Sequence, residues 1–135
     1  MTARIPDAYL DLLRSRAVAH FATLMADGAP QVSPVWVDVE ETPEGHVVLV
    51  NSKSGRVKNR NVVKRPQVAL EVSDPANPYR YVAIRGRVVG VTEKGAKAHL
   101  ETLAQRYTGK AYAWWSPDEV REVLRITIDK VSTFG

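Results

Sequence analysis

The sequence predicts a mainly β protein with flanking helices, folded as a small closed or split β-barrel of about six strands. Two observations carry this prediction. Strand-like apolar segments recur along the chain, and short turns, of which Asp27-Gly28 is a hairpin signal, join most of them. A chain of 135 residues is long enough for one core, so residues 1–135 are expected to form a single domain.

The first half is expected to hold a helix and three strands. Pro6 and Asp7 are typical of a helix start, and this helix should end near Arg16. Strands follow over residues 18–25, 31–39 and 46–51. Pro34 cannot donate a ladder hydrogen bond, so the second strand should lie at an edge or be bulged. Residues 47–50 of the third strand show little alternation of apolar and polar side chains, as expected when both faces of the strand are covered.

The second half continues with strands over residues 67–73 and 79–92. Gly86 is expected to mark a bend in the longer of the two. Helical spacing predicts a helix over residues 93–107, which Gly109 ends. Ser116 and Glu119 form a capping-box pattern that predicts a helix of one or two turns. A last strand is expected over residues 124–128.

Residues 51–66 form the most distinctive stretch. The pattern predicts a strand end, a Ser-Gly turn and a short helix that Pro66 ends. No acid accompanies its six cations, which are Lys53, Arg56, Lys58, Arg60, Lys64 and Arg65. Free N–H groups at a helix start, with Arg and Lys side chains beside them, make a site for a phosphate. The alternative interpretation is a solvated basic helix that binds nothing.

Several kinds of chemistry have no pattern in this sequence. There is no cysteine, and the histidines are scattered without metal-ligand spacing, so no metal site is expected. No nucleophile elbow or glycine-rich phosphate loop is present, so no catalytic residue is assigned and a cofactor should carry any reaction. No apolar run is long enough to span a bilayer and no signal-like block occurs. A cytoplasmic protein with no membrane partner is therefore expected.

Aromatic side chains indicate a planar ligand. Trp36 lies on a strand expected to line the barrel mouth, Tyr79 and Tyr81 open the long strand, and Trp114 and Trp115 adjoin Tyr112. Such rings either fill cores and interfaces or form flat walls for a planar molecule. A phosphate clamp, a planar wall and a small barrel together suggest a flavin-like cofactor.

The ordered motifs resemble a known family. They are the Asp27-Gly28 hairpin, Pro30-Gln-Val-Ser-Pro-Val-Trp36, Gly55-Arg-Val-Lys-Asn-Arg-Asn61, Arg65-Pro66, Ile84-Arg-Gly-Arg-Val88, Arg106-Tyr-Thr-Gly109 and Val123-Leu-Arg-Ile-Thr-Ile128. Together they are similar to the flavin/deazaflavin oxidoreductase superfamily, the pyridoxamine 5'-phosphate oxidase-like proteins that share the FMN-binding split barrel. The similarity is greatest to the branch that uses the deazaflavin coenzyme F420.

The resemblance implies a set of site residues. Cofactor-binding positions would be Gln31, Ser33, Val35, Trp36, Asn51, Ser52, Arg56, Lys58, Arg60 and Asn61. Family members are usually homodimers, so the partner subunit would supply the substrate-binding residues Tyr79, Tyr81, Trp114 and Trp115. The acidic tail of F420 would suit a basic rim formed by Lys53, Lys64 and Arg65.

The activity that the resemblance implies is hydride transfer. An F420H2-dependent reductase would act on an unsaturated acceptor such as a quinone, a conjugated lactone or a tetrapyrrole, with a proton from solvent or a tyrosine. The short segment after the last strand argues against vitamin B6 oxidation. The alternatives are an FMN oxidoreductase of the same fold, a non-catalytic carrier or sensor, and a single-strand nucleic-acid binder. Nucleic acid is not the expected partner because the cations lie in one short segment.

Overall fold

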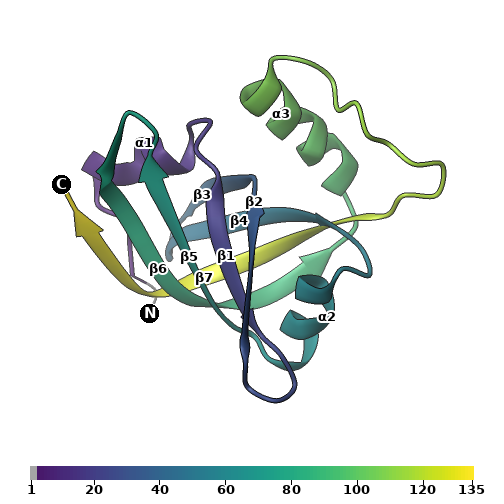
Figure 1. The fold of residues 1–135 in the computed structure, drawn as a ribbon, viewed down its shortest axis with the longest axis horizontal. Helices are drawn as coiled ribbons and strands as arrows, with labels where there is room; N and C mark the ends of the chain where they lie inside the picture. Colours follow the sequence, from purple (N-terminus) through teal and green to yellow (C-terminus); the bar gives the residue numbers. More distant parts are fainter. Residues whose placement is uncertain (1–2) are drawn as a thin grey trace.

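The computed structural model describes residues 3–135 as one antiparallel seven-stranded sheet that curls on itself, with helices around it (Figure 1). The predicted mainly β fold with flanking helices is confirmed. The strands are β1 (Ala19–Leu24), β2 (Pro30–Val35), β3 (Val37–Thr42), β4 (Gly45–Lys53), β5 (Gln67–Asp74), β6 (Asn77–Thr92) and β7 (Arg121–Phe134). The helices are a 3-10 turn η1 (Asp7–Tyr9) and the α-helices α1 (Leu10–Leu13), α2 (Val57–Lys64) and α3 (Ala96–Thr108). No helix within residues 3–135 is long and apolar enough to cross a bilayer.

The strand predicted over residues 31–39 is in fact two strands, which makes seven strands instead of about six. Across the sheet the order is β2-β1-β5-β6-β7-β4-β3, so β2 and β3 lie at opposite edges. Trp36 alone joins them. The two edges therefore meet at this residue, and the sheet closes into a barrel that is split along the seam. Pro34 lies in an edge strand, as predicted.

Side chains of α3 hold the corner at Trp36. The Val37 N–H donates to the Tyr107 hydroxyl (3.1 Å), which donates in turn to the Ala17 carbonyl (2.8 Å). Arg106 donates to the Val37 carbonyl. The Trp36 ring stacks on the Tyr107 ring with centroids 5.0 Å apart. The backbone N–H and carbonyl of Val37 therefore have side-chain partners at this corner. Buried backbone groups require such partners.

The core fills the inside of the barrel. Its fully buried side chains include Phe21, Val37, Val48, Leu124, Ile126 and Ile128. Strand β4 is buried from Gly45 to Ser52. One face of β4 points into the core, and on the other face Val47 and Leu49 pack with Ala96 of α3. The prediction that both faces of this strand are covered is confirmed.

The prediction of a helix after Ser116 is wrong. The capping contacts do form, because the Ser116 N–H and hydroxyl donate to Glu119 Oε1 at 3.1 and 3.2 Å. The second carboxylate oxygen, however, accepts a hydrogen bond from Arg121 (2.7 Å), and the Val120 carbonyl accepts one from the Ser54 N–H (2.8 Å). These bonds direct the chain into β7 after a single turn. The N-terminal helix is also shorter than predicted, since α1 ends at Leu13.

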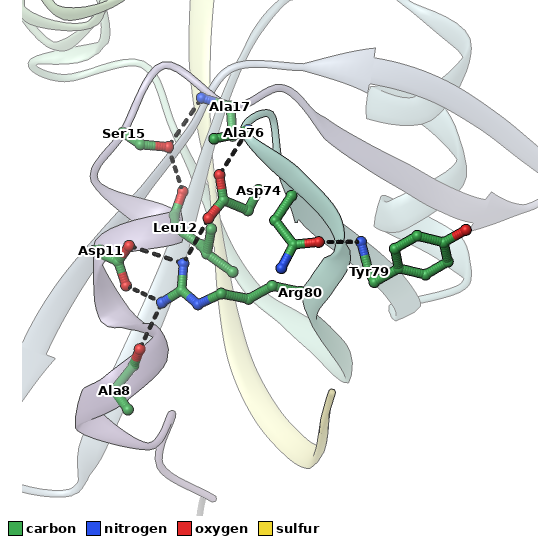
Figure 2. A network of polar contacts seen from close by, with 10 residues as sticks. Ala8, Asp11, Leu12, Ser15, Ala17, Asp74, Ala76, Tyr79 and Arg80 are labelled. Carbon is green, nitrogen blue, oxygen red and sulfur yellow. Dashed lines mark hydrogen bonds and ion pairs between the residues drawn. The ribbon is translucent and has the colours of Figure 1, made fainter. Parts of the chain in front are cut away.

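Arg80 of β6 fastens η1 and α1 to the hairpin between β5 and β6 (Figure 2). Its guanidinium contacts Asp11 at 2.6 and 3.1 Å, Asp74 at 3.2 Å and the Ala8 carbonyl at 2.7 Å. The hydrogen bond from Arg80 lowers the pKa of the Asp11 carboxyl, and the positive charge acts in the same direction. This end of the barrel lies at the left of Figure 1, whereas α2 and α3 lie at the right.

We expect the free energy of unfolding of Asp11→Asn to fall less with decreasing pH than that of wild type. A carboxyl whose folded-state pKa is lowered stabilises the fold fully above its unfolded-state pKa of about 3.9, and this contribution is lost as pH falls through the folded value. Wild type should therefore be the more stable protein at pH 7, and the two urea-denaturation curves should converge below about pH 4. A constant difference at all pH values would contradict the role of the Asp11 charge.

Candidate cofactor site

A cavity of about 400 Å³ opens between the barrel seam, the start of α2, helix α3 and the loop that follows α3. Its walls combine a corner of the sheet, the end of β4 and the start of β7. The lining residues are Val18, Pro34, Val35, Trp36, Asn51, Ser52, Lys53, Arg56, Lys58, Leu100, Tyr112, Trp114 and Arg121. A cavity of this size, part apolar and part cationic, suits a small-molecule ligand with an anionic group.

The predicted strand, turn and helix of the basic stretch are confirmed. Gly55 makes the turn at φ +87°, in the left-handed region that favours glycine. Arg56 is the N-cap residue of α2, and no side chain caps the helix. The first turn of α2 contains no acid. The positive end of the helix is therefore open to an anion, and Arg56 and Lys58 lie beside it on the cavity wall.

Lys58 is a buried cation without a counter-ion. Its side chain lines the cavity although the residue is only 8% exposed, and no hydrogen bond or ion pair joins it to another residue in the range 3–135. Burial lowers the pKa of its ammonium group, and the charges of Arg56 and Arg121 lower it further. A buried charge is costly unless it is paired, so this position favours a bound anion.

Ser52 supplies a second unsatisfied group. The residue is 3% exposed and lines the same cavity, and its hydroxyl has no hydrogen-bond partner among the described residues. Buried hydroxyls in proteins are nearly always hydrogen-bonded. A phosphate oxygen would accept a hydrogen bond from this hydroxyl, and the negative charge of the phosphate would neutralise Lys58.

Arg121 adds a third cation that sequence reasoning missed. It enters from β7 and pairs with Lys53 of β4 across the sheet. The residue is 7% exposed, and its Nε and NH1 atoms donate to Asn51 Oδ1 (3.0 Å) and Glu119 Oε2 (2.7 Å). Burial would raise the pKa of Glu119, but the hydrogen bonds from Arg121 and Ser116, with the positive charge of Arg121, together outweigh it and the pKa is lowered. Arg121 is thus held by a charged carboxylate at the cavity wall.

Aromatic rings form another part of the cavity wall. Tyr112 meets Trp36 edge-on with centroids 6.3 Å apart, and it meets Trp114 in the same way at 5.6 Å. Trp115 contacts Tyr112 at 5.0 Å, and it does not line the cavity. The Arg121 guanidinium lies over the Tyr112 ring, 5.7 Å from its centroid. The site therefore combines flat aromatic surfaces with cations, as a planar phosphorylated molecule requires.

The sequence profile of the pyridoxamine 5'-phosphate oxidase family matches residues 5–135, nearly the whole chain. The chain belongs to this family.

Solved structures agree with the family assignment. An F420 reductase from Mycobacterium smegmatis is 30% identical and superposes with a TM-score of 0.82, over 95% of this chain and 98% of that one. The Mycobacterium tuberculosis protein Rv2991 is 18% identical, with a TM-score of 0.72 over 98% and 86% of the two chains. HupZ of Group A Streptococcus is 16% identical, with a TM-score of 0.68 over 96% and 93%. The last two show the fold alone. No curated protein matches the sequence.

This family member brings only part of the predicted site set together. Seven of the predicted residues line the cavity, namely Val35, Trp36, Asn51, Ser52, Arg56, Lys58 and Trp114. Trp114 lies at the cavity of its own chain, contrary to the expectation that it serves the partner's site. That these side chains bind a cofactor stays a prediction.

The remaining predicted residues lie elsewhere. Asn61 donates to the Thr23 hydroxyl inside the fold (3.0 Å), and Arg60 donates to the Gly55 carbonyl (3.0 Å). Asn61 was expected at the cofactor because it lies one turn beyond Arg56, but its face of α2 packs against β1. Gln31 and Ser33 of β2 are outside the cavity lining. Tyr79 and Tyr81 lie at the far end of the barrel, where Tyr81 pairs with Phe134.

Within residues 3–135 no group of three or more His, Cys, Asp or Glu side chains could hold a metal ion. The functional groups of the candidate site are its cations, the Ser52 hydroxyl and its aromatic rings.

Proposed function

We propose that this protein is an F420H2-dependent reductase that passes a hydride to an unsaturated organic acceptor of the quinone, conjugated-lactone or tetrapyrrole type. The observation that carries the proposal is the cavity wall beside Arg56, where the buried Ser52 hydroxyl has no hydrogen-bond partner and the buried residue Lys58 has no counter-ion among residues 3–135. The 30% identity to an F420 reductase over 95% of the chain favours deazaflavin as the cofactor.

The residues present fit such a group. Arg56, Lys58 and Ser52 would hold its phosphate, with Arg121 as a further cation. Val35 and Trp36, at the barrel seam, would line its ring system. When reduced F420 is bound, it supplies a hydride, and this chemistry needs alignment of donor and acceptor more than an acid–base pair. The protein's part is to bind, to orient and to exclude water.

Two further roles follow for the cavity rim. Lys53 lines the cavity, so it is placed to attract the acidic tail of F420. Arg65, which was expected to do the same, is held by the Leu24 carbonyl (2.8 Å) and by Asn61 (3.2 Å). Tyr112 and Trp114 give the acceptor a flat apolar surface at the cavity wall.

We also propose that the protein acts as a homodimer. Tyr79 is 77% exposed. Tyr81 pairs with Phe134 at the last residues of β7, whereas Arg121, at the cavity, is the first residue of β7. Neither tyrosine can therefore reach the cavity of its own chain. If they bind substrate, they must do so in the cavity of a second copy. Sedimentation of the purified protein measures the mass directly, and a monomer at micromolar concentration would reject this part of the proposal.

Titration with F420 and with FMN tests the cofactor. Trp36 and Trp114 line the cavity, so their fluorescence reports binding of either molecule. We expect tight binding of F420 and turnover of F420H2 with a quinone acceptor. Tight FMN binding with none for F420 would replace the proposal by an FMN oxidoreductase, since an FMN phosphate also suits Arg56 and Lys58. Binding without turnover of any acceptor would indicate a carrier or sensor.

A further inference from the structure

A continuous line of polar contacts runs behind the candidate cofactor site. It begins at Arg106 of α3, which contacts Asp38 Oδ1 of β3 at 3.2 Å. Asp38 Oδ2 is 3.2 Å from His99 Nε2, and His99 Nδ1 is 3.1 Å from the Asn51 amide nitrogen. Asn51 Oδ1 then accepts from Arg121. Two of these residues, Asn51 and Arg121, line the cavity.

The orientation of the Asn51 amide is fixed by its other partners. Arg121 Nε can only donate, so the atom 3.0 Å from it must be the amide oxygen. The Ala96 carbonyl can only accept, so the atom 2.8 Å from it must be the amide nitrogen. Both assignments agree, and the usual ambiguity between amide oxygen and nitrogen is therefore resolved by chemistry.

The same logic fixes the tautomer of His99. The Asn51 amide nitrogen carries two hydrogens, one for Ala96 and one directed at His99 Nδ1. Nδ1 must therefore be an acceptor without a proton. In neutral imidazole the proton then lies on Nε2, which donates to Asp38 Oδ2. An ionised Asp38 completes this arrangement.

The charged groups around His99 agree with an ionised Asp38. Burial would raise the pKa of Asp38, but hydrogen bonds from His99 and the Val39 N–H, with the charge of Arg106, lower it overall. The other charged groups linked to this line are Arg121 of β7 and its partner Glu119. Both carboxylates therefore stay charged at neutral pH, and donors and acceptors match at each contact from Asp38 to Arg121.

We propose that His99 and Asp38 are positioning residues, which hold the Asn51 amide and through it the Arg121 guanidinium in place at the cavity wall. This inference rests on the proposed function for its effect on cofactor binding. Without His99, one hydrogen of the Asn51 amide would lose its acceptor, and only Ala96 and Arg121 would hold the amide against which the Arg121 Nε–H is placed. Neither His99 nor Asp38 lines the cavity, and His99 reaches it through Asn51.

Three substitutions of His99 separate its contact with Asn51 from its contact with Asp38. Asn has its terminal oxygen at the position of imidazole Nδ1, so His99→Asn keeps an acceptor for Asn51 and loses the contact to Asp38. Gln reaches the position of Nε2, so His99→Gln keeps a donor for Asp38 and loses the acceptor for Asn51. His99→Leu loses both. Thr102→Val, on the exposed side of α3, is the matched control because it removes only a hydrogen bond within the helix.

F420 binding is measured for each variant by titration. We expect His99→Leu and His99→Gln to bind F420 about tenfold more weakly than wild type, as the loss of one well-placed hydrogen bond predicts. His99→Asn should recover part of the affinity, because it keeps an acceptor for Asn51 but loses the support of Asp38, and Thr102→Val should match wild type. Wild-type affinity in a folded His99→Leu protein, or equal losses in His99→Asn and His99→Leu, would overturn the inference.

Nitrogen-15 NMR tests the positioning without any cofactor. We expect His99 to carry its proton on Nε2 in the wild-type protein at pH 7, and the Arg121 Nε–H to give a slowly exchanging signal that His99→Leu abolishes. A proton on Nδ1, or an Arg121 signal that His99→Leu leaves unchanged, would overturn the inference. If wild type binds neither F420 nor FMN, the proposed function fails, and these spectra alone decide the positioning role.

Discussion

Replacement of Lys58 by methionine is expected to weaken F420 binding by about 1.5–3 kcal/mol, or about 10- to 150-fold, if its ammonium contacts the cofactor phosphate. The same change should leave the free energy of unfolding equal or higher. Lys58 is a buried residue whose pKa is lowered by burial as well as by the positive charges of Arg56 and Arg121, and no counter-ion within residues 3–135 offsets its charge. Methionine keeps an apolar stem of similar length and removes the unpaired charge.

Isothermal titration with F420 and chemical denaturation measure the two effects separately. Lys94→Met, on an exposed lysine in the turn between β6 and α3, is the matched control for loss of one positive charge. It should change neither quantity by more than about 0.5 kcal/mol. If Lys58→Met lowers stability and leaves affinity unchanged, the ammonium has a structural partner and the phosphate site must lie elsewhere.

Local signals explain which parts of the site were predictable. The Ser54-Gly55 turn, the cations after it and the stop at Pro66 lie within sixteen residues, and each acts on its immediate neighbours. The strand, turn and helix therefore followed from the sequence, together with the places of Arg56 and Lys58 at the start of α2. Which side chains of this stretch face the cavity depends on what α2 packs against, as Asn61 illustrates with its bond to Thr23.

Contacts between distant segments explain what the sequence missed. Arg121 reaches the cavity because β7 pairs with β4, and a pairing over some seventy positions leaves no local pattern. The division of the predicted strand into β2 and β3 at Trp36 also depends on contacts with a distant segment. Val35, Val37 and Val39 keep a spacing of two residues from β2 into β3, so the pattern alone predicts one strand. The change of pairing partner is decided by Tyr107 and Arg106, which satisfy the backbone of Val37 from another element.

The candidate site is therefore assembled at the seam of the barrel. The corner at Trp36, the start of α2 and the first residue of β7 come together only when the two sheet edges meet. Closure of the barrel and formation of the site are the same event. Any change that prevents β6 and β7 from curving should then remove the site as well as the fold.

Gly86→Ala is expected to destabilise the protein by about 3 kcal/mol or more, which is enough to leave much of the chain unfolded. Gly86 lies in β6 beside a shift of register against β7, which confirms the bend predicted at this position. A β-carbon added to Gly86 would lie 2.1 Å from the Thr127 carbonyl oxygen and 3.1 Å from a methyl group of Ile126. The nearer neighbour is backbone of the paired strand, so it cannot move aside without breaking the ladder.

Gly90→Ala provides the comparison within the same strand. An added β-carbon there meets only the flexible Arg125 side chain, at 3.8 Å, which is ordinary contact. Alanine also restricts the unfolded chain, so Gly90→Ala should be neutral or slightly stabilising. Circular dichroism with urea denaturation measures both variants. Equal stability of the two would mean that β6 and β7 separate at Gly86 without cost, and the close backbone approach would then not be what curves the barrel.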